Sequence, residues 1–369
     1  MQFNYNMLCL ARDSRELTQS GLADRMKITQ GTLSKYETGL LAPPEDVVRE
    51  FANALAYPES FFFQGEQAYG FPPFHFRKRK KLGQKAMNRI IAEMNIRRMH
   101  VKRLALSYER DSTGFIPEID MDEYQGISKR RPTIEDIAQH VREAWGVPRG
   151  PIENMVGLIE RNGGIVVPCE FGTDLIDAMS QRIDGMPVLF FVNKAAPADR
   201  IRFTLAHELG HMILHTLSLS EDDTMEDQAD AFAGAFLLPT DEIRPQLRRI
   251  DLPHLANLKG YWKVSIAALM MRADRLDLIT PYQRKVFWMD MSRAGYRKSE
   301  PNEPAAESPE AIGRMIRFHQ RQLGYTNTDV STLLYLLPSE FTRLYSGALA
   351  TQPSTSAAPT LRVVNRTNS

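Results

Sequence analysis

The chain has 369 residues, 43% of them hydrophobic and 25% charged, and its formal net charge at pH 7 is +1. This composition is typical of a globular protein with two or three domains, and no apolar run approaches the roughly 18 residues of a membrane span, so we expect a cytoplasmic protein with no membrane partner. The two cysteines, Cys9 and Cys169, are too few and too far apart for a disulfide framework or a cysteine-based zinc cluster, which leaves histidine and carboxylate side chains as metal ligands.

The first 64 residues are predicted to form an all-α domain, because apolar residues recur at three- and four-residue steps without strand-like alternation. One helix opens at Thr18, and a short turn follows at Lys27. Thr29 is placed to cap a second helix that ends near Glu37, before Gly39. The pattern therefore predicts a helix, a tight turn and a second helix.

The predicted helix pair contains a set of short motifs, namely Leu17-Thr18-Gln19, Leu22-Ala23, Ile28-Thr29-Gln30, the run from Leu33 to Glu37, and Gly39. In these motifs residues 17–63 resemble the Cro/repressor-type (XRE) helix-turn-helix family, which implies binding to duplex DNA. The second helix of such a domain presents polar side chains to base edges and donors to phosphates. The candidate DNA-binding residues are Gln19, Thr29, Gln30, Gly31, Thr32, Ser34 and Lys35.

One residue of the turn departs from the family pattern. Lys27 stands where a glycine is usual, and a positive φ at this position would cost roughly 1 kcal/mol. The alternative to a DNA-binding domain is a helical packing module that has lost DNA binding.

Residues 65–131 are predicted to be a basic helical linker flanked by glycine and proline. Residues 1–104 hold 17 Lys and Arg against 10 Asp and Glu, a balance of +7, which leaves −6 for the rest of the chain. In residues 76–104 eleven basic residues face a single acid, Glu93. We expect a pair of basic helices, with the run from Arg77 to Lys85 on DNA phosphates; a solvated helix face is the equally favoured alternative.

The region 132–300 mixes helical and strand-like segments. Thr133 can cap a helix, and residues 151–161 read as another helix before a pair of glycines. Short β-rich runs follow at 165–167 and 187–193, and residues 252–297 are again helical, which indicates a small α+β domain. We expect residues 301–349 to form a helical C-terminal region with a pair of helices over 311–345. Residues 350–369 are rich in Ser, Thr and Pro and are expected to be disordered.

The motif H-E-x-x-H occurs at His207, Glu208 and His211, within a segment of helical spacing. Two histidines at i and i+4 lie on one face of a helix, so both imidazoles can bind one zinc ion beside Glu208. A five-residue match also arises by chance, so the alternative is a chance motif that binds no metal. Further ligands along the chain would make this alternative less favoured. A structural zinc would have no use for Glu208, so we expect this residue to be the catalytic base.

A catalytic zinc site needs a third protein ligand, and the predicted helix 225–238 offers Glu226 and Asp230 in an E-x-x-A-D spacing. This spacing resembles the second zinc helix of peptidases whose third ligand is a glutamate, which implies Glu226. Asp230 lies one helical turn away and can orient a ligating histidine. His215 is expected to support the site or the fold, and Arg202 to hold a carboxylate of the fold rather than an oxyanion.

The same region carries a longer set of motifs, namely Trp145-Gly146-Val147-Pro148, Gly150-Pro151-Ile152, the run from Arg202 to His211, Ala229-Asp230-Ala231-Phe232-Ala233 and Leu237-Leu238-Pro239. In these motifs residues 132–300 closely resemble the ImmA/IrrE family of zinc metallopeptidases. The resemblance implies a zincin-like fold, Zn²⁺ as the cofactor and a repressor-type protein as the substrate. Asp230 stands where many members have asparagine and Gln228 where an acid is frequent, and neither is an expected ligand.

The expected protein is multi-domain and mainly α, with an all-α helix-turn-helix domain, a small α+β zincin-like metallopeptidase domain and a helical C-terminal region. We expect a DNA-binding transcriptional regulator whose zinc-dependent endopeptidase cleaves a repressor-type protein to control stress or mobile-element genes. The alternative is a non-proteolytic transcription factor or antitoxin whose zinc domain senses a ligand or docks a partner protein. Because such regulators usually read palindromic half-sites, a homodimer is compatible with this interpretation.

Overall fold

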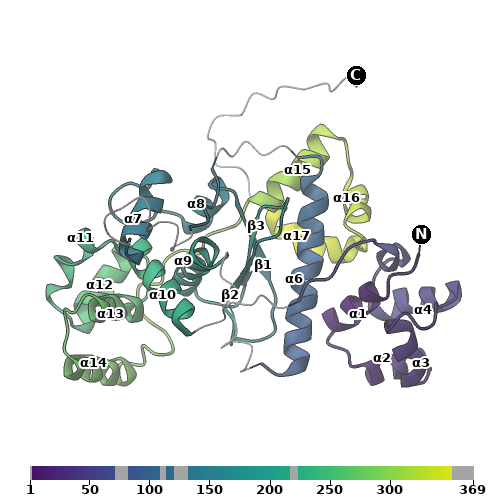
Figure 1. The fold of residues 1–369 in the computed structure, drawn as a ribbon, viewed down its shortest axis with the longest axis horizontal. Helices are drawn as coiled ribbons and strands as arrows, with labels where there is room; N and C mark the ends of the chain where they lie inside the picture. The colour runs from purple at the N-terminus through teal and green to yellow at the C-terminus, as the bar shows by residue number, and fades with distance from the viewer. Residues whose placement is uncertain (1, 71–81, 109–113, 120–131, 217–222, 351–369) are drawn as a thin grey trace.

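The computed structural model describes residues 2–70, 82–108, 114–119, 132–216 and 223–350, and it has the predicted fold class. An N-terminal helical domain is followed by a small mixed sheet with helices on both faces (Figure 1). The N-terminal domain consists of α1 (Tyr5–Ser14), α2 (Gln19–Met26), α3 (Gln30–Glu37), α4 (Glu45–Leu55) and the 3-10 helix η1 (Glu59–Phe63). Its core is centred on buried residues from each of these elements, among them Leu22, Leu33 and Phe51.

The turn between α2 and α3 has the geometry that the sequence predicted. Thr29 caps α3, since its hydroxyl oxygen accepts a hydrogen bond from the Thr32 N–H at 3.1 Å. Lys27 ends α2 in the left-handed region, at φ 54°, where a glycine would carry less strain. Gly39, at φ 74°, follows the end of α3. The chain therefore accepts one strained residue in order to set α3 across α2.

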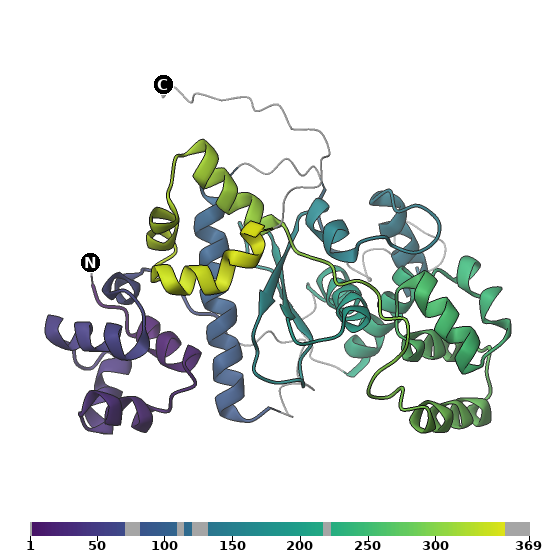
Figure 2. The same cartoon turned by 180° about the vertical axis from the view of Figure 1, so that it is seen from behind.

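A single long helix, α6 (Gln84–Ala105), lies between the N-terminal domain and the sheet (Figures 1 and 2). One face of α6 contributes Ala92, Ile96 and Met99 to the core of the N-terminal domain. The opposite face contributes residues such as Met94 and Val101 to the core behind the sheet. Because both faces make apolar contacts, α6 joins the two bodies through their cores rather than as an exposed tether.

Residues 84–105 form one continuous helix where a pair was expected, and part of the basic surface expected for this segment is buried. Lys85 and Lys102 are exposed, so phosphate binding by the rest of the basic run stays a prediction. Arg97 and Arg98 are each only 2% exposed. The Nε of Arg97 donates to the Glu93 carboxylate at 2.9 Å, and Arg98 donates to a backbone carbonyl of residue 67 at 2.6 Å. Arg97 and Arg98 thus have partners inside the protein, and their positive charges are not available to DNA phosphates. Residues 71–81, which hold Arg77 and the basic residues up to Lys81, lie outside the described residues.

In the described part of the chain, three strands form one mixed sheet in the order β1-β3-β2, namely β1 (Gly164–Cys169), β2 (Ala178–Gln181) and β3 (Val188–Asn193). β1 is parallel to β3, with Ile165 opposite Leu189, and β2 is antiparallel to β3, with Ser180 opposite Phe190. All six residues of β3 are buried, because helices cover both faces of the sheet. The strands β1 and β3 were predicted, whereas β2 was not.

One face of the sheet is covered by α8 (Met155–Arg161) and α9 (Ala198–Leu214). The helix α10 (Asp223–Leu237) packs on α9, and α7 (Ile134–Ala144) packs on α10. Beyond them lie α11 (Thr240–Ile243), the 3-10 helix η4 (Gln246–Arg248), α12 (Leu252–Trp262), α13 (Ile266–Arg275) and α14 (Pro281–Arg293). α9 contacts β2 and β3, and α10 lies along α9 (Figure 1). This arrangement holds α9 between the sheet and α10.

Two buried arginines fix the C-terminal end of α10. Arg142 of α7 donates to the carbonyl of Phe236 at 2.7 Å, and Arg272 of α13 donates to the carbonyl of Leu238 at 2.9 Å. Carbonyls at the end of a helix lack partners inside the helix, and cations there also offset the negative end of its dipole. The two arginines thereby hold α10 in place against α7 and α13.

The other face of the sheet is covered by α6 together with α15 (Ala311–Gln322), α16 (Asn327–Leu333) and α17 (Pro338–Ala350). The sequence predicted two helices here, and the structure has three. Tyr335, at φ 54°, follows α16, and Pro338 is the first residue of α17, so the run of helical residues is broken between them. The tail expected for residues 351–369 lies outside the described residues, and the predicted domain boundaries stay a prediction.

Candidate metal centre and DNA-binding surface

The helix α9 places the two histidines of the H-E-x-x-H motif on one face. The Nε2 atoms of His207 and His211 lie 3.1 Å apart, and their rings are 4.7 Å apart between centroids. His211 and Glu208 are fully buried, and His207 is nearly so. Because the histidines are one helical turn apart, their Nε2 atoms face the same point.

The helix α10 brings the third candidate ligand to that point. The Glu226 carboxylate lies 3.8 Å from His207 Nε2 and 3.4 Å from His211 Nε2. One ligand atom from each of these three residues fits within 4.8 Å of the others, a spacing that suits a metal ion. Gly210 allows this approach, because a Cβ there would lie 3.2 Å from the Cα of Ala229 on α10. The candidate metal centre is defined here by His207, His211 and Glu226.

The outer ring nitrogens of both histidines are also engaged. His207 Nδ1 donates to the Asp230 carboxylate at 2.7 Å. His211 Nδ1 lies 2.9 Å from His215 Nδ1, and His215 Nε2 lies 2.8 Å from the side-chain oxygen of Gln228. Hydrogen bonds at Nδ1 leave the lone pair of each imidazole at Nε2, which faces the candidate metal centre. Burial lowers the pKa of His215, which favours its neutral form.

Glu208 is held by Ser180, a residue that no sequence motif predicted. The Ser180 hydroxyl on β2 donates to a carboxylate oxygen of Glu208 at 2.7 Å, and both side chains are fully buried. The sequence did not predict β2, because the strand is only four residues long and its apolar and polar residues do not alternate clearly. A strand-to-helix contact of this kind appears only when the sheet is assembled on α9.

Arg202, one turn before His207, has the role in the fold that was expected of it. It forms an ion pair with Glu307 and donates to the carbonyl of Ile152 at 2.5 Å. Burial lowers the pKa of Arg202 to about 10. This arginine therefore ties α9 to the segment before α15 and to the loop before α8.

The helix-turn-helix presents a polar face around α3. Thr29, Gln30, Gly31 and Lys35 are exposed, and Thr32 and Ser34 are half-buried. The Thr29 hydroxyl serves as the helix cap, which places it beside the Thr32 hydroxyl at 2.9 Å. The candidate residues of α3 therefore share one accessible surface.

A side-chain network connects Gln19 to this surface. The Gln19 amide donates to the buried Glu37 carboxylate at 2.7 Å, and Arg12 donates to the same carboxylate at 2.5 Å. Gln30 donates to the Gln19 side-chain oxygen at 3.3 Å. The network holds the side chains of Gln19 and Gln30 in fixed orientations at the start of α2 and α3.

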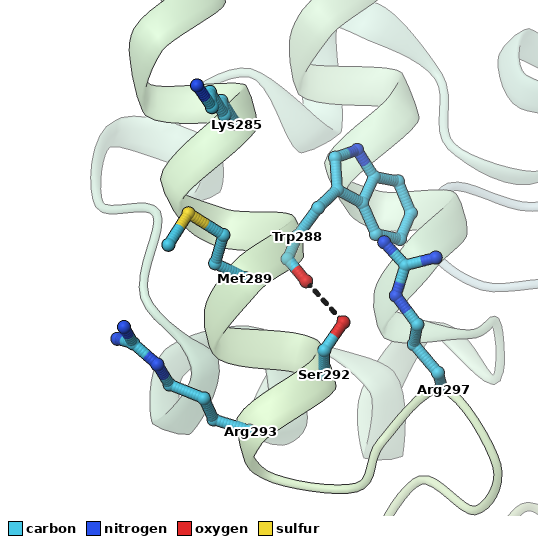
Figure 3. Close-up of a pocket in the computed structure, with 6 residues that line it drawn as sticks. All are labelled: Lys285, Trp288, Met289, Ser292, Arg293 and Arg297. Atoms are coloured by element: carbon cyan, nitrogen blue, oxygen red, sulfur yellow. Dashed lines mark hydrogen bonds between the residues drawn. The ribbon is translucent and has the colours of Figure 1, made fainter.

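A separate hollow of about 740 Å³ lies on α14 and is lined by Lys285, Trp288, Met289, Ser292, Arg293 and Arg297 (Figure 3). The Arg297 guanidinium lies over the Trp288 ring, 5.1 Å from its centroid. None of these residues belongs to α9 or α10. Among the described residues, its lining brings together cations and an aromatic ring without an acid.

None of the helices among the described residues is long and apolar enough to cross a membrane.

Comparison with known proteins assigns two parts of the chain. Residues 10–62 match the family model described as helix-turn-helix, and residues 160–274 match a peptidase family model described as the IrrE N-terminal-like domain. The radiation response metalloprotease IrrE of Deinococcus radiodurans is 48% identical over 46 residues. The match covers 12% of this chain and 13% of that protein, so it compares only a short part of either. The chain therefore combines a Cro/repressor-type (XRE) helix-turn-helix region with an ImmA/IrrE-type peptidase region.

Proposed function

We propose that this protein is a DNA-binding transcriptional regulator whose zinc-dependent endopeptidase region cleaves a repressor-type protein. The observation that carries the proposal is the convergence of His207, His211 and Glu226, with Glu208 next in sequence to His207. The helix-turn-helix region in the same chain supports the regulatory part of the proposal. The peptidase family match supports the catalytic part.

The donor set fits zinc. Two imidazole nitrogens and one carboxylate are the three protein ligands of many catalytic zinc sites, which keep a fourth position open. Asp230 and His215 engage the outer nitrogens of His207 and His211, so both Nε2 lone pairs face the Glu226 carboxylate. With zinc bound, the metal would supply Lewis acidity that polarises a peptide carbonyl and acidifies a water molecule.

Glu208 supplies the base. It takes a proton from the attacking water and passes that proton to the leaving amine, as a general base and then a general acid. The Ser180 hydroxyl fixes one oxygen of the carboxylate, so the side chain keeps its orientation through the proton transfer. Burial of Glu208 strengthens these electrostatic interactions because water does not screen them.

A peptide substrate agrees with the position of β2. This strand is at one edge of the sheet and contacts α9. An extended peptide can add to such an edge through backbone hydrogen bonds, and Ser180 on β2 contacts Glu208. A substrate strand along this edge would pass beside the candidate metal centre.

DNA recognition is assigned to α3. Gln30 and Thr32 would contact base edges, and Lys35 would contact phosphate. The Gln19 side chain, held by Glu37, would contact phosphate at the start of α2. Recognition of paired half-sites would require a homodimer, which stays a prediction.

Metal analysis tests the proposed ligands. The purified full chain should contain about one zinc per chain, and Glu226→Ala should lose most of it, because two histidines alone make a weak site. Glu208→Gln should retain the zinc, since Glu208 is not a ligand in this assignment. Full zinc retention in Glu226→Ala, or its loss in Glu208→Gln, would show that the two carboxylates have been assigned the wrong roles.

A further inference from the structure

A cavity of about 380 Å³ lies where α6, β1, α15 and α17 meet. Figure 2 shows α17 in front of α6 and beside the sheet, with α15 above it. None of the residues that line this cavity belongs to α9, α10 or the helix-turn-helix, so it is separate from both sites described above. Its volume is near the lower end of small-molecule pockets, which hold about 300 to 1,000 Å³.

Three basic side chains line the cavity. Arg97 of α6, Lys194 after β3 and Arg343 of α17 all contribute to its lining, and no Asp or Glu among the described residues does. The carboxylates that pair with these cations, Glu93, Glu170 and Glu340, lie outside the lining. The lining therefore carries three positive side chains and, among the described residues, no negative one, and each of these cations has a carboxylate partner beside the cavity.

The inner wall is a fixed and buried arginine. Arg97 is 2% exposed, and its Nε is anchored by the Glu93 carboxylate at 2.9 Å. Its guanidinium lies over the ring of Tyr345, 5.3 Å from the centroid, and Tyr345 also lines the cavity. The Tyr345 hydroxyl is in turn 2.7 Å from His100 Nδ1. A buried guanidinium held in one orientation by its neighbours is a preorganised site for an anion.

The other two cations are at the open side of the cavity. The side chains of Lys194 and Arg343 are 40% and 47% exposed. Both contact the half-exposed carboxylate of Glu170, at 3.7 Å and 3.0 Å. A ligand can reach this pair from solvent, and their flexible stems allow them to turn toward it.

The remaining walls are apolar. Val166 and Val167 of β1, Ile312 of α15 and Leu344 of α17 line the cavity. A free inorganic ion would leave these walls in contact with water, whereas a ligand with an organic body would cover them. We propose that this cavity binds a small organic anion, with a carboxylate or phosphate group on Arg97, Lys194 and Arg343 and an apolar body against Val166 and Ile312.

Calorimetric titration of the full chain with citrate, AMP and inorganic phosphate tests this site, and adenosine is the neutral counterpart of AMP. At least one of citrate and AMP should bind, more tightly than inorganic phosphate, and adenosine should not bind measurably. Binding of citrate alone identifies a carboxylate ligand, and binding of AMP alone identifies a phosphate ester. The absence of binding by both organic anions, or equal binding of AMP and adenosine, would overturn the proposal.

Two variants locate the binding site. Lys194→Ala with Arg343→Ala removes the two accessible cations and should weaken binding by about tenfold or more, because charge-assisted hydrogen bonds are lost. Gly347→Leu keeps every cation and adds a bulky apolar side chain to the lining, since Gly347 is an exposed lining residue and a Cβ added there meets no atom within 4 Å. It should weaken binding to a similar extent, and the control Arg293→Ala on α14 should bind like wild type. Unchanged affinity in either cavity variant would show that the ligand binds elsewhere.

Discussion

The Nδ1 atoms of His211 and His215 lie 2.9 Å apart, so one ring must donate its proton to the other. The side-chain oxygen of Gln228 can only accept, which places a proton on His215 Nε2 and leaves its Nδ1 as the acceptor. His211 therefore carries its proton on Nδ1 and directs the Nε2 lone pair at the candidate metal centre. His207 reaches the same tautomer by a different route, through the Asp230 carboxylate.

This relationship predicts that His215 positions a metal ligand. His215→Leu should weaken zinc binding by about 10- to 100-fold, because His211 loses the acceptor that fixes its tautomer and orientation. His215→Asn should remain within a few fold of wild type, since the asparagine oxygen occupies the position of Nδ1. Competition with a chromophoric chelator measures both affinities. Equal affinities for the leucine and asparagine variants would contradict a positioning role.

The close approach of α9 and α10 predicts the effect of filling Gly210. Gly210→Ala should destabilise the protein by about 1 to 3 kcal/mol, because the new Cβ would push against the backbone of Ala229 and the ring of Phe232. It should also weaken zinc binding by moving Glu226 away from the histidines. Gly260→Ala on α12 is the matched control, since nothing lies within 4 Å of its added Cβ. This control should gain about 0.5 to 1 kcal/mol. Equal stabilities of the two variants in urea unfolding would contradict a tight contact between α9 and α10 at Gly210.

The buried His100 predicts a dependence of stability on pH. Burial holds the pKa of His100 well below its usual value, and the charges of Arg97 and Arg103 lower it further. Below about pH 6.5 the unfolded chain binds a proton that the folded chain does not, so stability should fall by about 1.4 kcal/mol per pH unit from this residue. The fall should continue until the pH reaches the depressed pKa of the folded state.

Stability of His100→Asn between pH 7 and pH 5.5 checks this sign. The unfolding free energy of the variant should fall less steeply with decreasing pH than that of wild type, by the slope that corresponds to one bound proton. His140→Asn changes an exposed histidine on α7 and should keep the wild-type slope. A wild-type slope in His100→Asn would mean that another group accounts for the acid sensitivity.

The exposed face of α3 predicts separate effects on DNA affinity and specificity. Gln30→Ala should cost about 1 to 3 kcal/mol on the cognate site and much less on random DNA, since a base contact is lost. Lys35→Ala should weaken binding to both DNAs and reduce the slope of log affinity against log salt concentration by about one. Fluorescence anisotropy at several salt concentrations separates the two. An equal loss on cognate and random DNA in Gln30→Ala would remove this residue from the base-reading face.

Helix periodicity accounts for what the sequence could predict about the site. The spacing of His207 and His211 fixes their common face without any tertiary information, and the same holds for Glu226 and Asp230 on α10. The N-caps at Thr29 and Thr133 are local in the same way, because a hydroxyl binds an N–H only three residues away.

The features that the sequence did not predict depend on long-range contacts. The hydrogen bond from Ser180 to Glu208 requires β2 to pair with β3 and then to meet α9. The burial of Arg97 and Arg98 depends on α6 lying between two cores, whereas charge density alone suggested an exposed helix. Composition reports how many charges a helix carries and not which of them find partners inside the protein.

We propose that Glu208 serves zinc-dependent cleavage of a protein. Mass spectrometry of protein N-termini, in cells that make wild type, Glu208→Gln or the exposed control Asp227→Asn, tests it even while the substrate is unidentified. We predict a new N-terminus inside a repressor-type protein with wild type and with the control, and its reduction by about 10²- to 10⁴-fold in Glu208→Gln, with zinc retained. The same set of N-termini in all three strains would contradict proteolysis and favour a protein that senses a ligand or docks a partner.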